Sequence, residues 1–238
     1  MIEPRPFFAL LATTAVVLSA NSRTEAATVL GAGSTAAGDF LLGNDLTDPE
    51  NDGAPDANTG YNATFSGNEE ASFGGGEAAF NIFDNRVGGG NDKWCCGSGG
   101  ANLPFWVDAT FSQPVVLTHF TLTSGNDSVP VRDARAWRIQ GSNDQINYVD
   151  IFVQGVDGTS ASVWNTINQT IRWDGEGADF ETPAAFTTIR FQADATANQA
   201  GAHFHLNEFE IFGEVVPEPT STTLLSMAGL GIALRRRR

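Results

Sequence analysis

The stretch LPFWVDATF, residues 103–111, alternates apolar with more polar side chains. Its apolar members share one parity: Phe105, Val107, Ala109 and Phe111. Successive side chains of a β-strand point to opposite faces, so a repeat of two indicates a strand with one buried face. We therefore predict a half-buried strand here, with Trp106 and Asp108 on its other face.

The same signal recurs on both sides of this stretch. Further predicted strands lie at 116–122, 136–140, 148–153, 169–173, 186–192 and 203–212. Clusters of Gly, Asn, Asp and Ser separate them, and no stretch between 27 and 215 sustains a helical period. Short strands at this spacing predict an all-β, antiparallel sandwich or barrel.

The last of these strands changes phase. Phe204 and Leu206 have one parity, whereas Phe209 and Ile211 have the other. One extra residue would bring all four onto the same face, so we predict a β-bulge near Asn207.

The charge of the chain limits its partners. The net charge is −15, and Lys93 is the only lysine. Such a surface repels nucleic acid, so we expect no nucleic-acid partner. The glycine runs at 74–76 and 88–90 are not followed by Lys-Ser/Thr and are predicted to be surface loops.

Cys95 and Cys96 are adjacent and are the only cysteines. A disulfide between neighbouring cysteines closes no long loop, so this pair does not predict a cross-link between distant parts of the fold. A vicinal disulfide, an intermolecular bond and two packed thiols all remain open.

The N-terminus has the pattern of an export signal. An apolar run at 7–18 follows Arg5, and small residues continue to Ala27. This pattern predicts a helical signal peptide over 1–26 and export across the inner membrane. The alternative is a buried N-terminal helix.

The C-terminus has three parts in order. Pro217, Glu218 and Pro219 are followed by an uncharged segment, 220–234, and then by four arginines: Arg235, Arg236, Arg237 and Arg238. The apolar segment is shorter than the roughly 20 residues of a stable span. The arginines would stay on the cytoplasmic side of a membrane. A simple tail anchor is one interpretation.

The three parts together resemble the PEP-CTERM sorting signal. The resemblance covers about 23 residues. It implies transient contact of a hydrophobic helix at 215–238 with the membrane, recognition by an exosortase, and cleavage near Pro217-Glu218-Pro219. The expected destination is the cell surface or the extracellular matrix.

A second resemblance covers most of the body of the chain. Five segments, in order, resemble a discoidin domain, also called the coagulation-factor C-type or galactose-binding-like domain: FDN (83–85), KWC (93–95), LPFWVDATF (103–111), RDARAWRIQGSND (132–144) and HLNEFEIFG (205–213). The resemblance implies an antiparallel jelly-roll β-sandwich over 79–214, with 27–78 adding a strand and acidic loops. It departs from the family at Ala134, where Pro is usual, and at Gln145, where Gly is usual. The usual Cys pair joining the domain ends is also missing.

The resemblance also implies one structural Ca²⁺. Carried over by position, its ligands fall on Asp84 and Glu208, with Asn85, Asn91 or Asp92 from the intervening loop. Calcium takes six to eight oxygen ligands, and some of them can be neutral main-chain carbonyls. Two carboxylates therefore suffice as the charged ligands of such a site. The alternative is that these acids are merely solvated.

A separate acidic stretch, NDLTDPENDGAPD at 44–56, has an EF-hand-like start. Counted from Asp48 as the first position of a calcium-binding loop, the twelfth position is Thr59, where an EF-hand requires Glu. We therefore predict a plain solvated loop.

The sequence favours a binding protein. It contains neither a Gly-x-Ser-x-Gly nor a His-Glu-x-x-His motif, and we predict that it is not an enzyme. A module binding exopolysaccharide or another glycoconjugate is the first hypothesis, with Arg132, Trp164 and Trp173 as ligand-binding residues. The alternatives are a matrix or adhesion protein that binds other proteins and, less favoured, a secreted glycan hydrolase.

Overall fold

The computed structural model describes residues 27–33, 40–48, 61–68, 76–88, 92–95, 103–155, 160–197 and 203–217. In this part of the chain the strands are β1 (Thr28–Ala32), β2 (Ala63–Gly67), β3 (Trp94–Cys95), β4 (Phe105–Thr123), β5 (Ala134–Ser142), β6 (Val149–Gln154), β7 (Gln169–Asp174), β8 (Phe186–Thr196), β9 (His205–Leu206) and β10 (Glu208–Val215). One 3₁₀ helix, η1 (Ala79–Phe83), precedes β3. All pairings are antiparallel, which confirms the predicted all-β class.

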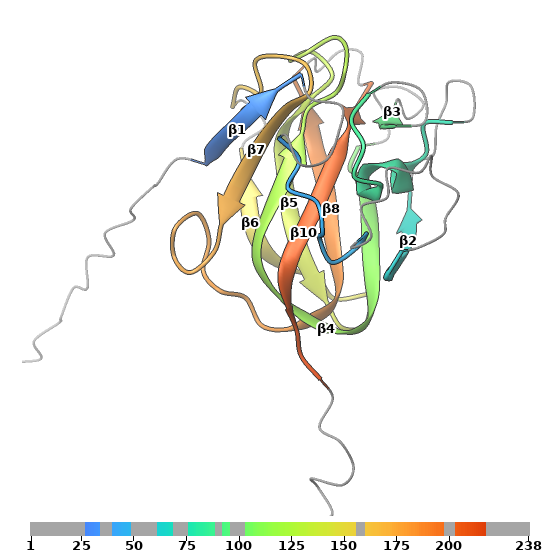
Figure 1. Ribbon diagram of the computed structural model, residues 1–238, viewed down its shortest axis with the longest axis vertical. Coiled ribbons are helices and arrows are strands. Elements are labelled where there is room, and N and C mark those ends of the chain that lie inside the picture. The colour runs from blue at the N-terminus through green and yellow to red at the C-terminus, as the bar shows by residue number, and fades with distance from the viewer. Residues whose placement is uncertain are drawn as a thin grey trace, which may run out of the picture.

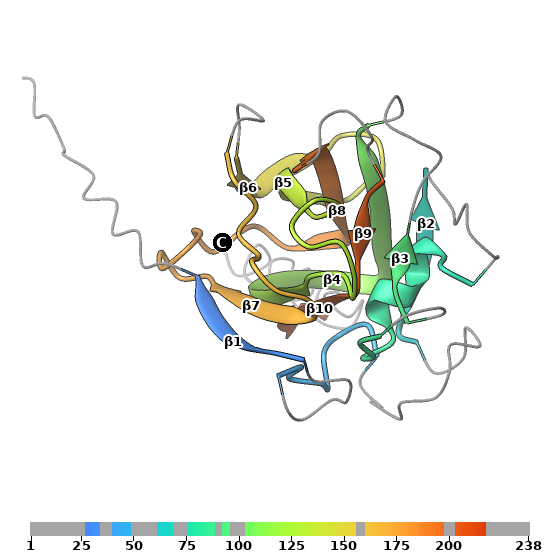
Figure 2. The ribbon, with the colours of Figure 1, turned by 90° about the horizontal axis from the view of Figure 1, so that it is seen from above.

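Strand β4 connects the two sheets of the sandwich (Figures 1 and 2). Its first half pairs with β2 on one side and with β8 on the other. Its second half pairs with β10 and β7 instead. The register to β8 jumps between Thr110 and Val115, where the strand bends from one sheet into the other. The segments predicted at 105–111 and 116–122 are therefore one bent strand.

We call the two layers the first sheet and the second sheet. The first sheet has the order β2, β4, β8, β5, β6, and the second has the order β1, β7, β4, β10. Because β1 and β2 both pair with these strands, the region before residue 78 contributes to the sandwich.

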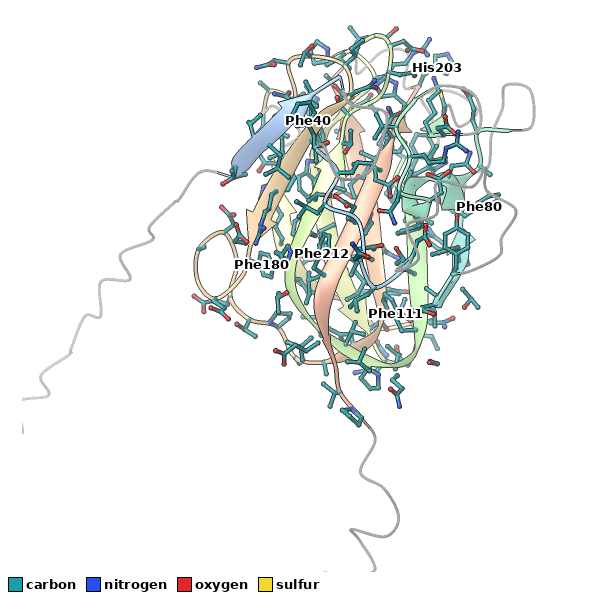
Figure 3. The ribbon with its side chains drawn as sticks, viewed as in Figure 1. Phe40, Phe80, Phe111, Phe180, His203 and Phe212 are labelled. Atoms are coloured by element: carbon teal, nitrogen blue, oxygen red, sulfur yellow. The ribbon has the colours of Figure 1, made fainter. Side chains whose placement is uncertain are left out.

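The core lies between the sheets and is rich in aromatic rings (Figure 3). Phe120 stacks on Trp173 with 5.3 Å between ring centroids, and Trp137 meets Trp173 edge-on at 5.1 Å. Trp164 packs on the other side of Trp137 at 6.2 Å. These rings come from β4, β5, β7 and the segment before β7, so they tie the two layers together.

One end of the sandwich, here called the loop end, is formed by the β4–β5 loop (124–133) and the segments 160–168 and 203–207 (Figure 1). Main-chain bonds join these segments: the Asn168 N–H donates to Gly125 (3.1 Å), and the His205 N–H donates to Arg132 (3.3 Å). His203 lies at this end in Figure 3, and β10 leads away from it.

The phase change predicted in the last strand is a break between two strands and not a bulge within one, since the register shift of β10 lies between Phe212 and Gly213. Strand β9 ends at Leu206, and β10 begins at Glu208. The Asn207 N–H donates to Thr123 (3.0 Å). Leu206 and Phe209 are consequently both buried in spite of their opposite parity.

The helices predicted for the signal peptide and for the C-terminal apolar segment lie outside the described residues. Within the described ranges, we find no helix whose length and hydropathy would let it cross a membrane.

Candidate functional site

Four carboxylates form a buried group that we call the acidic cluster: Asp45, Asp84, Glu208 and Glu210. Phe209 and Ile211 of β10 point into the core, so Glu208 and Glu210 point to the opposite face of the second sheet. There the segment 40–48 and the turn after η1 cover them. The Gly43 N–H donates to Glu210 (2.6 Å), and the Ile211 N–H donates to Asp45 (2.9 Å).

Two of the predicted calcium ligands, Asp84 and Glu208, meet in this cluster. The Arg86 main-chain N–H donates to both Asp84 Oδ1 (3.1 Å) and Glu208 Oε2 (3.2 Å). Asn85, in the left-handed region at φ 55°, donates its amide to the Asp48 carbonyl (2.8 Å). The buried Asn85 Oδ1 accepts no hydrogen bond from any described residue.

Asp92 takes a different position from that expected of a ligand. The Arg86 Nε atom lies 3.1 Å from its Oδ1, and this ion pair is partly exposed. The Arg86 side chain therefore neutralises Asp92, whereas its main-chain N–H donates hydrogen bonds to the buried Asp84 and Glu208. Asn91 lies outside the described residues.

Burial dominates the electrostatics of the acidic cluster. Burial, and after it the charges of Asp84, Glu210 and Asp45, raise the pKa of Glu208 well above its ordinary value. Burial likewise raises the pKa of Glu210 to about 7 and the pKa of Asp45, although hydrogen bonds partly offset both shifts. Among the described residues, Glu208 has no ion-pair partner.

The expectation that 44–56 is a plain solvated loop was wrong for its described part. Asp45, Thr47 and Asp48 are buried. Asp45 accepts hydrogen bonds from the main chain of Thr47 (3.2 Å) and Asp48 (3.1 Å), which turns this segment onto β10. No group of three His, Cys, Asp or Glu side chains within the described ranges is arranged to hold a metal by itself.

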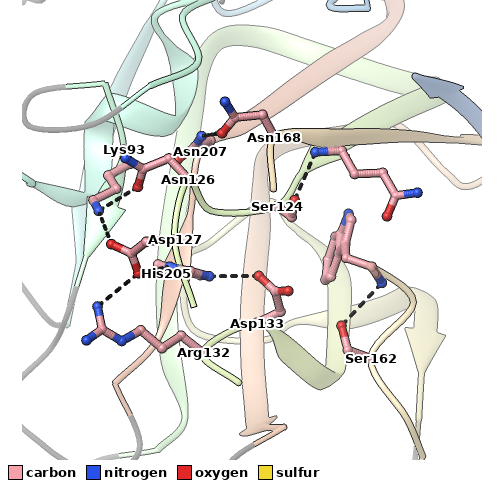
Figure 4. A network of polar contacts seen from close by, with 12 residues as sticks. Lys93, Ser124, Asn126, Asp127, Arg132, Asp133, Ser162, Asn168, His205 and Asn207 are labelled. Carbon is pink, nitrogen blue, oxygen red and sulfur yellow. Dashed lines mark hydrogen bonds and ion pairs between the residues drawn. The ribbon is translucent and has the colours of Figure 1, made fainter. Parts of the chain in front are cut away.

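A second group of polar side chains lies at the loop end, and we call it the His205 network (Figure 4). Its members are Lys93, Asn126, Asp127, Arg132, Asp133 and His205. His205 Nε2 lies 2.8 Å from Asp133 Oδ1, and both side chains are buried.

Asp127 and Arg132 are the accessible members of this network. Arg132 Nη1 donates to Asp127 Oδ1 (3.2 Å), and Lys93 Nζ donates to Asp127 Oδ2 (3.3 Å). The Asp127 side chain is 45% exposed and that of Arg132 is 28% exposed, whereas Lys93 is 5% exposed. Burial raises the pKa of Asp127, but Lys93, His205 and Arg132 together outweigh it, so the pKa is lowered. Asp127 is therefore a fixed, charged acceptor beside a fixed donor.

Of the residues predicted to bind a ligand, the structure places only Arg132 at an accessible site. Trp164 and Trp173 are each 2% exposed and belong to the core, so neither can offer a ring face to a sugar. The signal was present in the sequence, because Trp173 has the same parity as Ile171 and must share its buried face.

Several residues of both sites were not anticipated. Lys93 and Asp127 come together because β3 pairs with β9 beside the β4–β5 loop, a contact that no local pattern reveals. Glu210 did carry a signal, since it shares the parity of Glu208 on the closing strand.

Two other predictions fall at the edge of the described chain. Cys95 is disulfide-bonded, and Cys96 is the only other cysteine of the sequence. Pro217 is exposed beyond the end of β10. Glu218, Pro219 and Arg235–Arg238 lie outside the described residues.

Two antiparallel sheets that share one bent strand define a sandwich of the jelly-roll class. The chain belongs to the F5/8 type C (discoidin-like) domain family, which matches residues 62–205. Domains of this family are binding modules and are generally non-catalytic.

Solved structures of similar fold include three from different sources. CpGH89CBM32-5 from Clostridium perfringens, in complex with GalNAc-beta-1,3-galactose, is 15% identical, with 63% of this chain and 95% of that chain covered and a TM-score of 0.45. Chitosan-binding module 1 of a chitosanase/glucanase from Paenibacillus sp. IK-5 is 19% identical, with 64% and 96% covered and a TM-score of 0.44. A fucolectin from Morone saxatilis is 16% identical, with 66% and 48% covered and a TM-score of 0.48. A search of the curated proteins gave no match.

Proposed function

We propose that the protein is an exported carbohydrate-binding module whose ligand site is the Asp127–Arg132 pair at the loop end. The observation that carries the proposal is the contrast in exposure within the His205 network. The accessible Asp127 carboxylate accepts hydrogen bonds from the buried Lys93 and from the Arg132 guanidinium, and the Arg132 main-chain carbonyl accepts one from the His205 N–H. Groups fixed before binding lose little entropy when a ligand arrives.

The chemistry of the pair suits sugar hydroxyls. An ionised carboxylate accepts and a guanidinium donates charge-assisted hydrogen bonds, so neighbouring hydroxyls of one ring could engage both. The acidic surface of the chain disfavours nucleic acid and polyanionic ligands. The family membership is consistent with a binding role.

A glycan array screened with the full chain tests this proposal. Arg132→Ala and Asp127→Ala should each weaken binding to the retained glycans by about tenfold or more, as expected for central contacts. Arg172→Ala is the matched control, because Arg172 pairs with Asp174 on β7. Equal binding by wild type and both loop-end variants would contradict the site.

We also propose that the acidic cluster holds one Ca²⁺ as a structural ion. The fit rests on the donor set: Asp84 and Glu208 supply charge, Asn85 Oδ1 is a buried oxygen that accepts no hydrogen bond from the described residues, and main-chain carbonyls complete such shells. The ion would compensate the buried charge of these groups and fasten the turn after η1 to β10.

For the C-terminus we propose sorting by an exosortase, with residues 216–238 removed at the membrane. The support is the sequence resemblance together with the exposure of Pro217 after the last strand. Intact-mass measurement on protein from the native host tests it. A mass that still includes Arg235 to Arg238 would reject processing and favour an anchor.

A further inference from the structure

The outer face of the first sheet carries a tryptophan that is not part of the core. Of the five tryptophans, Trp94, Trp137, Trp164 and Trp173 are buried, whereas Trp106 is partly exposed. Its neighbours Phe105 and Val107 point into the core, so the Trp106 ring lies on the solvent side of β4.

Trp106 belongs to a fixed stack with Arg190 of β8 and Tyr148, which directly precedes β6. The Arg190 guanidinium carbon lies 3.9 Å from the Trp106 ring centroid and 3.7 Å from the Tyr148 ring centroid. Contacts of this kind hold a cation over an aromatic face. The guanidinium thus lies between two partly exposed rings, one from β4 and one from the residue before β6.

Asp108 locks this stack from below. It accepts two hydrogen bonds from Arg190, at 2.7 and 2.9 Å, and one from the Tyr148 hydroxyl at 2.7 Å. Because Asp108 is itself buried, neither the guanidinium nor the phenol is free to rotate away. The rings are therefore oriented before any ligand arrives.

The charges of this face nearly cancel, since two arginines pair with three carboxylates. Arg190 is paired with Asp108, and Arg138 is paired with both Asp150 and Asp194. The side-chain amides of Gln140 and Gln192 donate to Asp150 and Asp194, both at 2.7 Å. On a chain of net charge −15, this face is nearly neutral and rich in planar hydrogen-bonding groups.

We propose that this face is a second binding site, for a chain of uncharged polysaccharide. Sugar rings have apolar faces that stack on aromatic rings, and their hydroxyls bond to amides at the edges. The surrounding negative charge disfavours an acidic polysaccharide. The sheet spans about 19 Å from its first to its fifth strand, which is long enough for several sugar rings in a row. This site is separate from the Asp127–Arg132 pair and does not depend on it.

Two assays with the full chain test the inference: removal of the protein from solution by insoluble polysaccharide, and retardation in gels that contain soluble polysaccharide. Cellulose, curdlan and galactomannan are the neutral probes, and alginate is the anionic probe. Wild type should be retained by at least one neutral probe, and Trp106→Ala should weaken that retention by about tenfold or more. Trp106→Phe and Gln192→Ala should each weaken this retention by less than Trp106→Ala does. These milder variants keep the test valid if Trp106→Ala fails to fold. Ile146→Ala, on the adjacent turn and 81% exposed, should bind as wild type.

The two sites are distinguished by their variants. Arg132→Ala should leave retention by the neutral probe unchanged. Retention by alginate alone, no retention by any probe, or a folded Trp106→Ala protein that binds as wild type would each overturn the inference. None of these results would affect the loop-end proposal, which depends on Arg132 and Asp127.

Discussion

Asp84 and Glu208 accept hydrogen bonds from the same main-chain N–H, that of Arg86, although they lie near opposite ends of the domain sequence. A neutral N–H shared between two carboxylates offsets only part of the cost of burying their charge. This relationship leads to the first prediction.

Removing calcium should lower the melting temperature of the protein. An ion bound only by the folded state adds about 2.7 kcal/mol at a concentration 100 times its dissociation constant. Glu208→Ala should lower the melting temperature and abolish any further effect of chelator. Glu214→Ala is the control on the same strand, because Glu214 is exposed. Identical melting curves of wild type with and without excess chelator would refute the calcium site.

Trp137→Ala should be among the most destabilising substitutions. Its ring is buried and contacts the rings of Phe120, Phe152, Trp164, Trp173 and Phe191. A cavity of this size is expected to cost about 3–5 kcal/mol in the free energy of unfolding, measured by denaturant titration. A loss below about 1 kcal/mol would mean that the core is not packed as described.

Gln145→Gly should stabilise the protein. Gln145 has φ 58°, a left-handed conformation that costs a side-chain-bearing residue about 1–2 kcal/mol. Glycine adopts this conformation freely, and the substitution removes only a long hydrogen bond, 3.4 Å, from the Gln145 amide to the Thr110 hydroxyl. We expect a gain of about 1 kcal/mol by denaturant titration, net of the entropy that glycine adds to the unfolded chain. A loss of stability would show that the turn is not strained.

Asp144→Asn should destabilise the protein at neutral pH but not in acid. Hydrogen bonds from Asn147, through its main chain and side chain, and from the Ile146 main chain lower the pKa of Asp144. A depressed pKa stabilises the fold above the ordinary value of about 4, and that contribution is lost as the pH falls through the folded value. The melting-temperature difference between wild type and variant should therefore shrink between pH 5 and 3. A difference independent of pH would refute this role.

The sequence predicted the strands from residue 105 onward because alternation is a local property, but it predicted one strand before residue 78, where β1 and β2 both form, and it missed β3. Phe105 to Phe111 reveal their buried face without reference to the rest of the chain. The bend of β4 after Thr110 was missed, because the alternation of Phe105 to Phe111 resumes in the same phase at Val115 and Leu117, so the burial pattern does not mark the bend. Only the pairing with β8, β10 and β7 shows that the two segments are one strand.

The candidate sites were predicted less completely for the same reason. Asp84 and Glu208 were predicted by matching segments of the chain, in order, to those of discoidin domains. The structure brings these two residues together. Asp45 was assigned to a solvated loop, because nothing local indicates that its segment covers β10. Lys93 and Asp127 meet only through the β3–β9 pairing.

The direction of β10 determines how a tethered molecule would be oriented. The strand begins at Glu208, beside Thr123 at the loop end, and finishes at Val215, beside Val115 at the bend of β4. Its eight residues carry the chain about 26 Å along the sandwich. Any attachment made beyond Pro217 would therefore hold the domain by its far end. The Asp127–Arg132 pair would point outward from the supporting surface, and the Trp106 face would stand upright beside it, open to fibres that pass between neighbouring molecules.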